Sequence, residues 1–80
     1  MRKPPFDVGE KVFAVPFDEY LGYYRGDDDG NPIPVTILEP MLMTNGFMYL
    51  FKVMEPDGFA NVYSEKELFR TEEEIPQIGE

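Results

Sequence analysis

The feature that most constrains the fold is a pair of turn signals on either side of a short, strongly apolar segment. Residues 44–46 contain Asn-Gly, the strongest short signal for a β-hairpin, and residues 55–58 have the turn sequence Glu-Pro-Asp-Gly. Residues 47–54 are apolar at nearly every position, and residues 59–63 follow as a candidate antiparallel partner. The pattern predicts consecutive antiparallel strands, with 47–54 as a central strand that is covered on both faces.

Two further segments have the composition of strands. Residues 11–15 (KVFAV) and 35–39 (VTILE) are rich in β-branched and aromatic side chains, and a proline follows each of them. The apolar residues 41–43 either lie beyond the end of the second strand or continue it past a bulge at Pro40. With a short strand within residues 20–25, about five strands predict an all-β, strongly bent small antiparallel barrel.

Two short helix-start signals lie near the end of the chain. Residues 64–67 (SEKE) fit the capping box, and residues 71–74 (TEEE) repeat the pattern. Each predicts only a single 3-10 or helical turn, because little helical sequence follows. The length of 80 residues predicts one domain, residues 1–80, with a long loop at 16–34 and a frayed tail at 75–80.

The residue types that the chain lacks exclude several kinds of binding and catalytic site. The chain has no Cys and no His, which excludes disulfides, thiolate zinc sites and the commonest general base and metal ligand. The single serine, Ser64, is explained by its capping pattern, and a chain of this size offers little cleft. We therefore expect a protein that is not an enzyme, with no catalytic residues, no metal and no cofactor.

The charge and hydropathy of the chain bear on its location and partners. Sixteen acids against seven bases give a formal net charge of −9, which argues against binding to phosphate backbones or anionic lipid. No apolar run approaches the roughly 20 residues that span a bilayer, and no signal-peptide core follows the basic start. We expect a cytoplasmic protein that binds neither nucleic acid nor membrane directly.

Two segments resemble parts of a known architecture. Residues 8–15 (VGEKVFAV) are similar to the first strand of SH3-like small barrels, including Tudor- and KOW-type modules. Residues 61–74 (NVYSEKELFRTEEE) are similar to the close of such barrels, where a strand runs into a 3-10 turn and a short last strand. Short uncharacterised bacterial and phage proteins show the same pairing. The resemblance implies an SH3-like barrel, a fold that hosts many unrelated roles.

The resemblance makes residues 16–34 the long loop after the first strand. In peptide-binding SH3 domains this loop is acidic and contacts basic, proline-rich ligands. The loop matches them in character at Asp18, Glu19, Asp27, Asp28 and Asp29. The tryptophan of those ligand grooves has no counterpart, because the chain contains no Trp.

Tyrosines occur beside acids in the same segment. Tudor-like barrels bind methylated Lys or Arg in aromatic cages through cation–π attraction. Candidates for such a cage, together with an acid such as Asp18 or Glu19, are Tyr20, Tyr23, Tyr24, Tyr49 and Tyr63. The alternative is that these rings complete a small core. On a strand, Tyr23 and Tyr24 would face opposite sides, so both cannot belong to one cage.

Residues 27–31 (DDDGN) have the beginning of a calcium-loop pattern. Asp27, Asp29 and Asn31 occupy its first, third and fifth positions. The loop then needs Gly at the sixth position and Glu at the twelfth, where this chain has Pro32 and Leu38. A solvated loop tip explains the segment, so no metal site is predicted there.

The apolar middle of the chain is a second candidate surface. A closed barrel buries only one face of each strand, so the other face of residues 47–54 needs a cover. A candidate hydrophobic interface comprises Met41, Met43, Met48 and Phe51. The alternative is that the 16–34 loop and the tail fold over it. The sequence leaves self-association and the oligomeric state open.

The functional prediction is a non-enzymatic protein-binding module of bacterial or phage type, with a protein as partner. Charge and aromatic rings coincide at the expected binding residues, which are Asp18, Glu19, Tyr20, Tyr23, Tyr24, Asp27, Asp28 and Asp29. The alternative is an acidic phage-type inhibitor whose carboxylates imitate a phosphate backbone in the basic groove of a nucleic-acid-handling or host-defence enzyme. The same charge also serves solubility.

Overall fold

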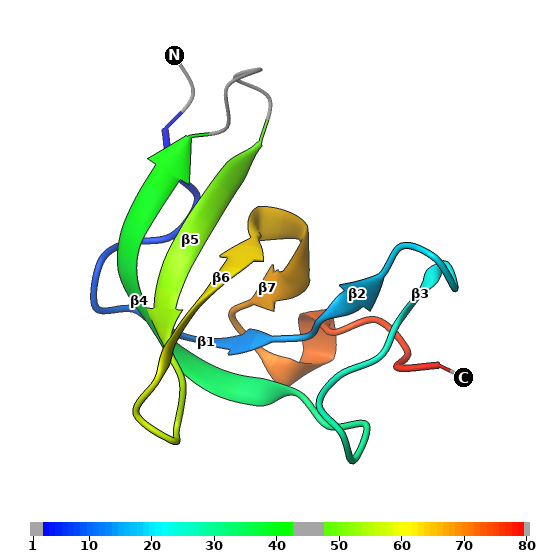
Figure 1. Cartoon of the computed structure of the whole chain (residues 1–80). Helices are drawn as coiled ribbons and strands as arrows, with labels where there is room; N and C mark the ends of the chain where they lie inside the picture. Colours follow the sequence, from blue (N-terminus) through cyan, green and yellow to red (C-terminus); the bar gives the residue numbers. More distant parts are fainter. Residues whose placement is uncertain (1–2, 43–47, 80) are drawn as a thin grey trace.

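The chain forms a five-stranded antiparallel sheet that curls into a half-barrel (Figure 1). The computed structural model describes residues 3–42 and 48–79. In spatial order the sheet contains β6 (Ala60–Ser64), β5 (Tyr49–Met54), β4 (Ile33–Leu42), β1 (Lys11–Ala14) and β7 (Leu68–Phe69). A separate hairpin joins β2 (Phe17–Asp18) to β3 (Tyr23–Tyr24), and two 3-10 turns, η1 (Glu65–Glu67) and η2 (Glu72–Glu74), lie near the C-terminus. The prediction of an all-β, strongly bent antiparallel fold with short C-terminal turns is confirmed.

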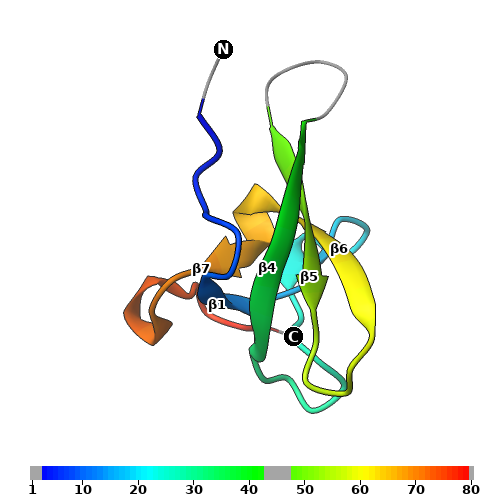
Figure 2. The ribbon, with the colours of Figure 1, turned by 90° about the vertical axis from the view of Figure 1, so that its left-hand side faces the viewer.

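The bend of the sheet originates in β4, which changes its partner along its length. Its first part pairs with β1 from Ile33 to Thr36, and its second part pairs with β5 from Thr36 to Leu42. The register with β5 shifts between Ile37 and Glu39, so a bulge at this point adds to the bend. Figure 2 shows β4 and β5 rising together beyond the rest of the sheet.

Both prolines of β4 lie where the strand has a single neighbour. Pro34 pairs with Phe13 of β1, and Pro40 pairs with Phe51 of β5. A proline lacks the N–H that a ladder needs, so it is tolerated where one side of the strand is free. The strand therefore continues past Pro40, and its register shift lies before that residue.

The two turn signals have different outcomes. The Asn-Gly turn at residues 44–46 lies outside the described residues, although β4 and β5 pair antiparallel up to Leu42 and Tyr49. The second turn joins β5 to β6, as predicted. Its Glu55 N–H donates to the Phe59 carbonyl at 2.9 Å, and the Gly58 N–H donates to the Glu55 carbonyl at 2.9 Å.

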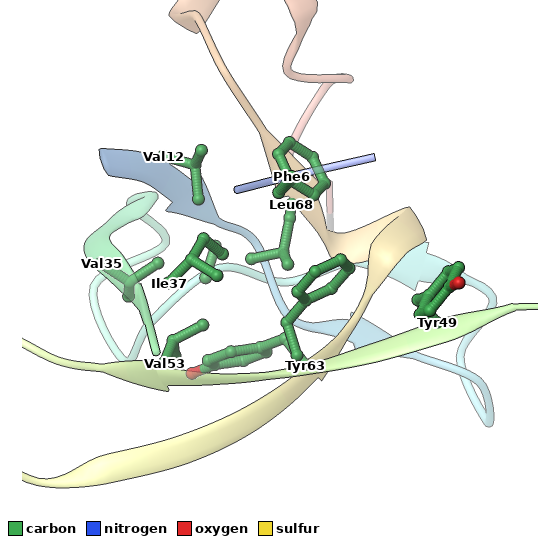
Figure 3. Close-up of a cluster of buried hydrophobic side chains, with 10 residues drawn as sticks. Phe6, Val12, Val35, Ile37, Tyr49, Val53, Tyr63 and Leu68 are labelled. Atoms are coloured by element: carbon green, nitrogen blue, oxygen red, sulfur yellow. The ribbon is translucent and has the colours of Figure 1, made fainter. Parts of the chain in front are cut away.

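The core occupies the concave side of the sheet (Figure 3). Side chains of β5 alternate between buried and more exposed positions, with Tyr49, Phe51 and Val53 inside and Lys52 and Met54 outside. The buried cluster comprises Phe6, Val12, Ala14, Val35, Ile37, Tyr49, Phe51, Val53, Tyr63 and Leu68. The expectation that the central strand is covered on both faces is wrong, because a curled single sheet buries one face only.

The turn η1 lies between β6 and β7 in the chain and is hydrogen-bonded to the start of the β2–β3 hairpin. The Glu67 carboxylate accepts hydrogen bonds from the Ser64 N–H at 3.0 Å, the Ser64 hydroxyl at 3.1 Å and the Phe17 N–H at 2.9 Å. The Glu67 carbonyl accepts the Val15 N–H at 2.7 Å. The predicted capping relation between Ser64 and Glu67 is confirmed, and the same carboxylate also holds a segment fifty residues away.

The C-terminal residues run beside the β2–β3 hairpin. Ile78 forms a parallel bridge with Tyr24, and the Gly79 N–H donates to the Tyr24 carbonyl at 3.0 Å. The 16–34 segment and the tail therefore pack against each other. None of the helical segments in the described ranges has the length and apolar character needed to cross a membrane.

Candidate functional site

Two acidic loops meet at one end of the half-barrel. The loop at 26–31 joins β3 to β4, and the loop at 55–58 joins β5 to β6, and both lie at the bottom of Figure 1. They line one shared hollow, whose wall comprises Pro16, Gly26, Asp27, Asp28, Ile33, Glu55, Pro56 and Asp57. Its four carboxylates define what we call the acidic end: Asp27, Asp28, Glu55 and Asp57.

The loop at 26–31 is shaped by hydrogen bonds of its own residues. Asp27 Oδ1 accepts the Asp29 N–H at 2.9 Å and the Asn31 N–H at 2.8 Å, and the Asp27 N–H donates to the Asn31 carbonyl at 2.9 Å. Gly26 has a φ of +73°, and a Cβ there would lie 2.9 Å from the Asn31 carbonyl oxygen. The aspartates are thus placed by a tight turn that needs glycine at its base.

The loop at 55–58 is anchored to the core side of β6. The Tyr63 hydroxyl donates to Glu55 Oε2 at 2.5 Å, and Asp57 Oδ1 accepts the Phe59 N–H at 3.1 Å. Burial of the phenol, together with the Glu55 carboxylate beside it, raises the pKa of Tyr63. Glu55 therefore has a fixed direction at the rim of the hollow.

The carboxylates of the acidic end differ in their ionic contacts from three acids elsewhere in the chain. Ion pairs join Asp18 to Arg25 at 3.5 Å, Glu19 to Lys66 at 3.7 Å, and Glu10 to Arg70 at 2.5 Å. Within the described ranges, none of the four acidic-end carboxylates takes part in an ion pair. Four negative charges that share one hollow produce a local negative potential, which attracts cations.

An apolar groove adjoins the acidic end on the outer face of the sheet. Its wall comprises Lys11, Val12, Phe13, Pro34, Val35, Thr36, Met54, Glu55 and Pro56. Glu55 and Pro56 also line the acidic hollow, so the groove and the hollow are neighbours that share these two residues. Val12 and Val35 are buried beneath it, whereas Met54 is 38% exposed.

The predicted aromatic residues have separate environments. Tyr20 lies at the tip of the β2–β3 hairpin and is 96% exposed. The Tyr24 ring packs edge-on against Phe17 at 4.8 Å and Phe69 at 5.9 Å, and its hydroxyl donates to the Lys66 carbonyl. Tyr23 precedes it in β3 and therefore faces the other side, near Gly79. Tyr24 thus completes a small aromatic cluster, in line with the alternative to a cage.

The predicted acidic residues divide into two groups. Asp27 and Asp28 belong to the acidic end, and Asp29 follows them in the same loop. Asp18 instead accepts the Leu21 N–H at 2.9 Å and pairs with Arg25, so it stabilises the hairpin. Glu19 pairs with Lys66 of η1. Among the described residues, no group of three or more His, Cys, Asp or Glu side chains is arranged to hold a metal ion.

Two acidic-end residues, Glu55 and Asp57, were missed by the sequence reasoning. The Glu-Pro-Asp-Gly sequence predicts a turn, and that prediction assigns no role to its two carboxylates. The available signal was that this turn, like the 26–31 loop, carries acids and no base. That signal does not reveal that the two loops meet, because their approach depends on the curl of the sheet.

One residue of the predicted methionine interface lies in the core instead of at the surface. Phe51 is fully buried, because it shares the inward face of β5 with Tyr49 and Val53, so its inclusion in a surface interface is wrong. Met41 and Met48 are half-buried near the far ends of β4 and β5. Met43 lies outside the described residues.

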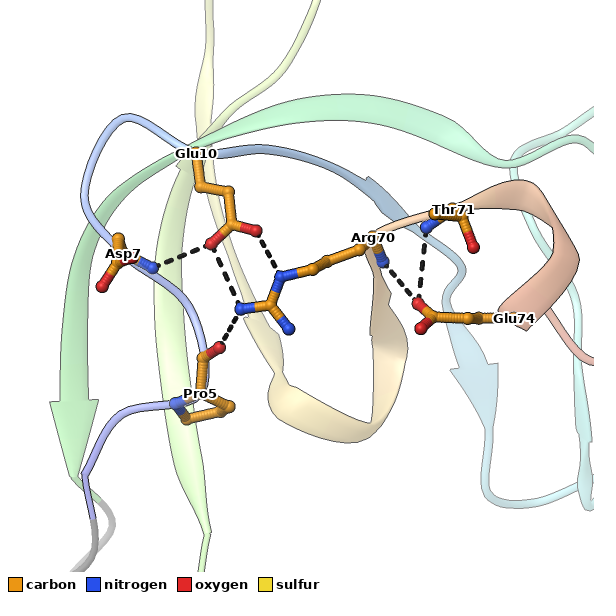
Figure 4. A network of polar contacts seen from close by, with 6 residues as sticks. All are labelled: Pro5, Asp7, Glu10, Arg70, Thr71 and Glu74. Carbon is orange, nitrogen blue, oxygen red and sulfur yellow. Dashed lines mark hydrogen bonds and ion pairs between the residues drawn. The ribbon is translucent and has the colours of Figure 1, made fainter.

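A network around Arg70 holds the N-terminal segment to the end of the chain (Figure 4). The Arg70 guanidinium donates to Glu10 and to the Pro5 carbonyl and lies 4.7 Å from the centre of the Phe6 ring. The hydrogen bond to Glu10 lowers the pKa of that carboxyl and raises the pKa of Arg70. The Glu74 carboxylate accepts the Arg70 N–H at 2.9 Å, so η2 positions the arginine. We assign this network to stability rather than to binding.

Comparisons with known proteins identify no relatives for this chain. No family model matches the sequence, and neither a curated protein nor a solved structure is significantly similar to it.

Proposed function

We propose that this protein is a non-enzymatic protein-binding module on an SH3-like barrel, and that its acidic end binds a basic segment of a partner protein. The observation that carries the proposal is the meeting of two loops whose four carboxylates line one hollow with no cationic partner among the described residues. A lysine or arginine side chain of the partner supplies a complementary positive charge. Complementary charge also speeds encounter and disfavours acidic competitors.

The arrangement of the strands supports the SH3-like part of the proposal. The segment at 8–15 that resembles the first strand of such barrels supplies β1. The segment at 61–74 that resembles their close supplies most of β6, then the 3-10 turn η1 and the short strand β7. β7 pairs with β1, so the two segments meet in the sheet.

The test compares two pairs of charge-neutralising substitutions. Asp28→Asn with Asp57→Asn removes two charges from the acidic end, and the amide oxygen introduced at position 57 can still accept the Phe59 N–H. Glu72→Gln with Glu73→Gln removes the same charge from exposed positions in η2. With tetralysine as the ligand and calorimetry as the measurement, we expect the first pair to weaken binding several-fold and the second to change it little. Equal weakening by both pairs would contradict the proposal.

A second candidate function is inhibition of a nucleic-acid-handling enzyme by charge mimicry. The favourable observation is that Asp27 and Asp28 are exposed and form no ion pair within the part of the chain that the structure describes. A mimic of this kind would compete with DNA for a basic groove, and its affinity would fall steeply as salt is raised. Binding that is unaffected by competing DNA would favour the first function over this one.

A further inference from the structure

We infer that the apolar groove beside the acidic end receives an aliphatic side chain of the same basic segment. The ligand is then a short peptide segment of a partner protein, in which an aliphatic residue neighbours lysines or arginines. This inference rests on the proposed function and specifies the ligand class of that site. The structural reason is that Glu55 and Pro56 line both the apolar groove and the acidic hollow, so one peptide segment can reach both.

The groove has the composition of a docking surface for an apolar side chain. Phe13, Pro34 and Met54 alternate with the core residues of their strands and therefore lie on the outer face. Phe13 pairs with Pro34 across β1 and β4, and Thr36 pairs with Met54 across β4 and β5, so these residues form one continuous strip. An aliphatic side chain that packs against this strip is removed from water, and this burial of apolar surface lowers the free energy of binding.

The charges around the groove indicate how the segment would lie. Lys11 borders the groove on the β1 side, where it pairs with Thr36, and Glu55 borders it at the end of β5. The acidic hollow continues beyond Glu55. The basic residues of the segment therefore belong at the Glu55 end and its aliphatic residue belongs over Phe13 and Met54, away from repulsion between like charges.

The net charge favours a basic partner segment over two other occupants. A second copy of this chain would bring another formal charge of −9 to an end that is already acidic. An anionic lipid surface would be repelled in the same way. A peptide with both apolar and basic residues complements the groove and the hollow together.

The test uses two tetrapeptides of equal charge, acetyl-Lys-Leu-Lys-Lys-amide and acetyl-Lys-Gly-Lys-Lys-amide, with affinities measured by calorimetry. We expect the leucine peptide to bind about five- to tenfold more tightly, because it buries part of its side chain in the groove. Met54→Gln should abolish this preference. Val62→Gln is the matched control, since Val62 is 44% exposed on β6 but does not line the groove, and it should leave the preference intact.

The outcomes separate the inference from the proposed function. Equal affinity for the two peptides, or a preference that survives Met54→Gln, would overturn the groove inference while leaving the acidic end as a binding site. Failure of both peptides to bind would overturn the proposed function as well. A concentration-dependent dimer that Met54→Gln dissociates, seen by sedimentation, would assign the groove to a second copy of the chain and overturn the inference.

Discussion

Glu67 shows how much one half-buried carboxylate can hold together in a chain of this length. It accepts hydrogen bonds from Ser64 on its own turn and from the backbone of Phe17. Glu67→Ala leaves these donors without an acceptor, so we expect the free energy of unfolding to fall by about 2 kcal/mol in urea denaturation. Glu72→Ala, at an exposed position in η2, should change it by less than about 0.5 kcal/mol. Equal effects would show that η1 does not depend on this carboxylate.

The Glu10–Arg70 pair should stabilise the fold in a pH-dependent way. The pKa of Glu10 is lower in the folded chain than its ordinary value of 4.5, so folding favours the ionised form. Its contribution is complete above that value and is lost as the pH falls below it. Glu10→Gln should therefore cost about 0.5–1 kcal/mol at neutral pH, with the difference from wild type vanishing in acid. A constant difference across the acid range would contradict this prediction.

Tyr63 should ionise at a higher pH than an ordinary tyrosine, because its pKa is raised. Its pKa is raised above the ordinary value of 10.0 by burial and by Glu55, so its contribution to stability is complete below that value and is lost as the pH rises. Tyr63→Phe removes its hydrogen bond and should lower the free energy of unfolding by about 1 kcal/mol at neutral pH. Phenolate absorbance should lose its late-titrating component in this variant. An unchanged alkaline titration would place Tyr63 in an ordinary environment.

At the scale of elements, the two acidic loops differ in how strongly each requires its glycine. Gly26 and Gly58 both have positive φ, at +73° and +90°, but of the two only Gly26 has backbone atoms with which a Cβ would collide. We expect Gly58→Ala to cost about 1 kcal/mol from the left-handed conformation alone. Gly26→Ala should cost clearly more, because the chain at 30–31 must also move. Equal losses of stability for the two variants in thermal denaturation would contradict this prediction and indicate that the 26–31 loop rearranges to accommodate the Cβ at little cost.

The elements with local signals were predictable from the sequence. Residues 55–58 form the expected turn, and Ser64 with Glu67 forms the expected cap of a single 3-10 turn. The sequence does not determine the course of β4 past Pro40, because tolerance of that proline depends on which side of the strand has a neighbour. The sequence of one strand does not contain that information.

The candidate site was only partly predictable for the same reason. Asp27 and Asp28 stood out as charged residues in a loop, and the structure places them at the acidic end. Glu55 and Asp57 lie much further along the chain, beyond the whole of β4 and β5. Their approach to the first loop follows from the change of partner in β4, which is a property of the whole sheet.

At the scale of the whole molecule, the acids that give the net charge of −9 differ in whether they have basic partners. Acids on the β2–β3 hairpin and beside the N-terminal segment have basic partners, whereas the four at the acidic end have none among the described residues. The half-barrel therefore has one end at which four carboxylates without ion pairs among the described residues line a single hollow. The outer-face groove, with Met54 at its wall, opens at this same end.

Chemical-shift mapping can locate the surface that binds a basic peptide. Backbone amide resonances of the isotope-labelled protein are followed as acetyl-Lys-Leu-Lys-Lys-amide is added at low salt. We expect the largest changes in the loops at 26–31 and 55–58 and at Met54, and we expect these changes to diminish as salt is raised. Changes confined to the hairpin tip around Tyr20, or to the acids of η2, would contradict this expectation and place the binding surface elsewhere.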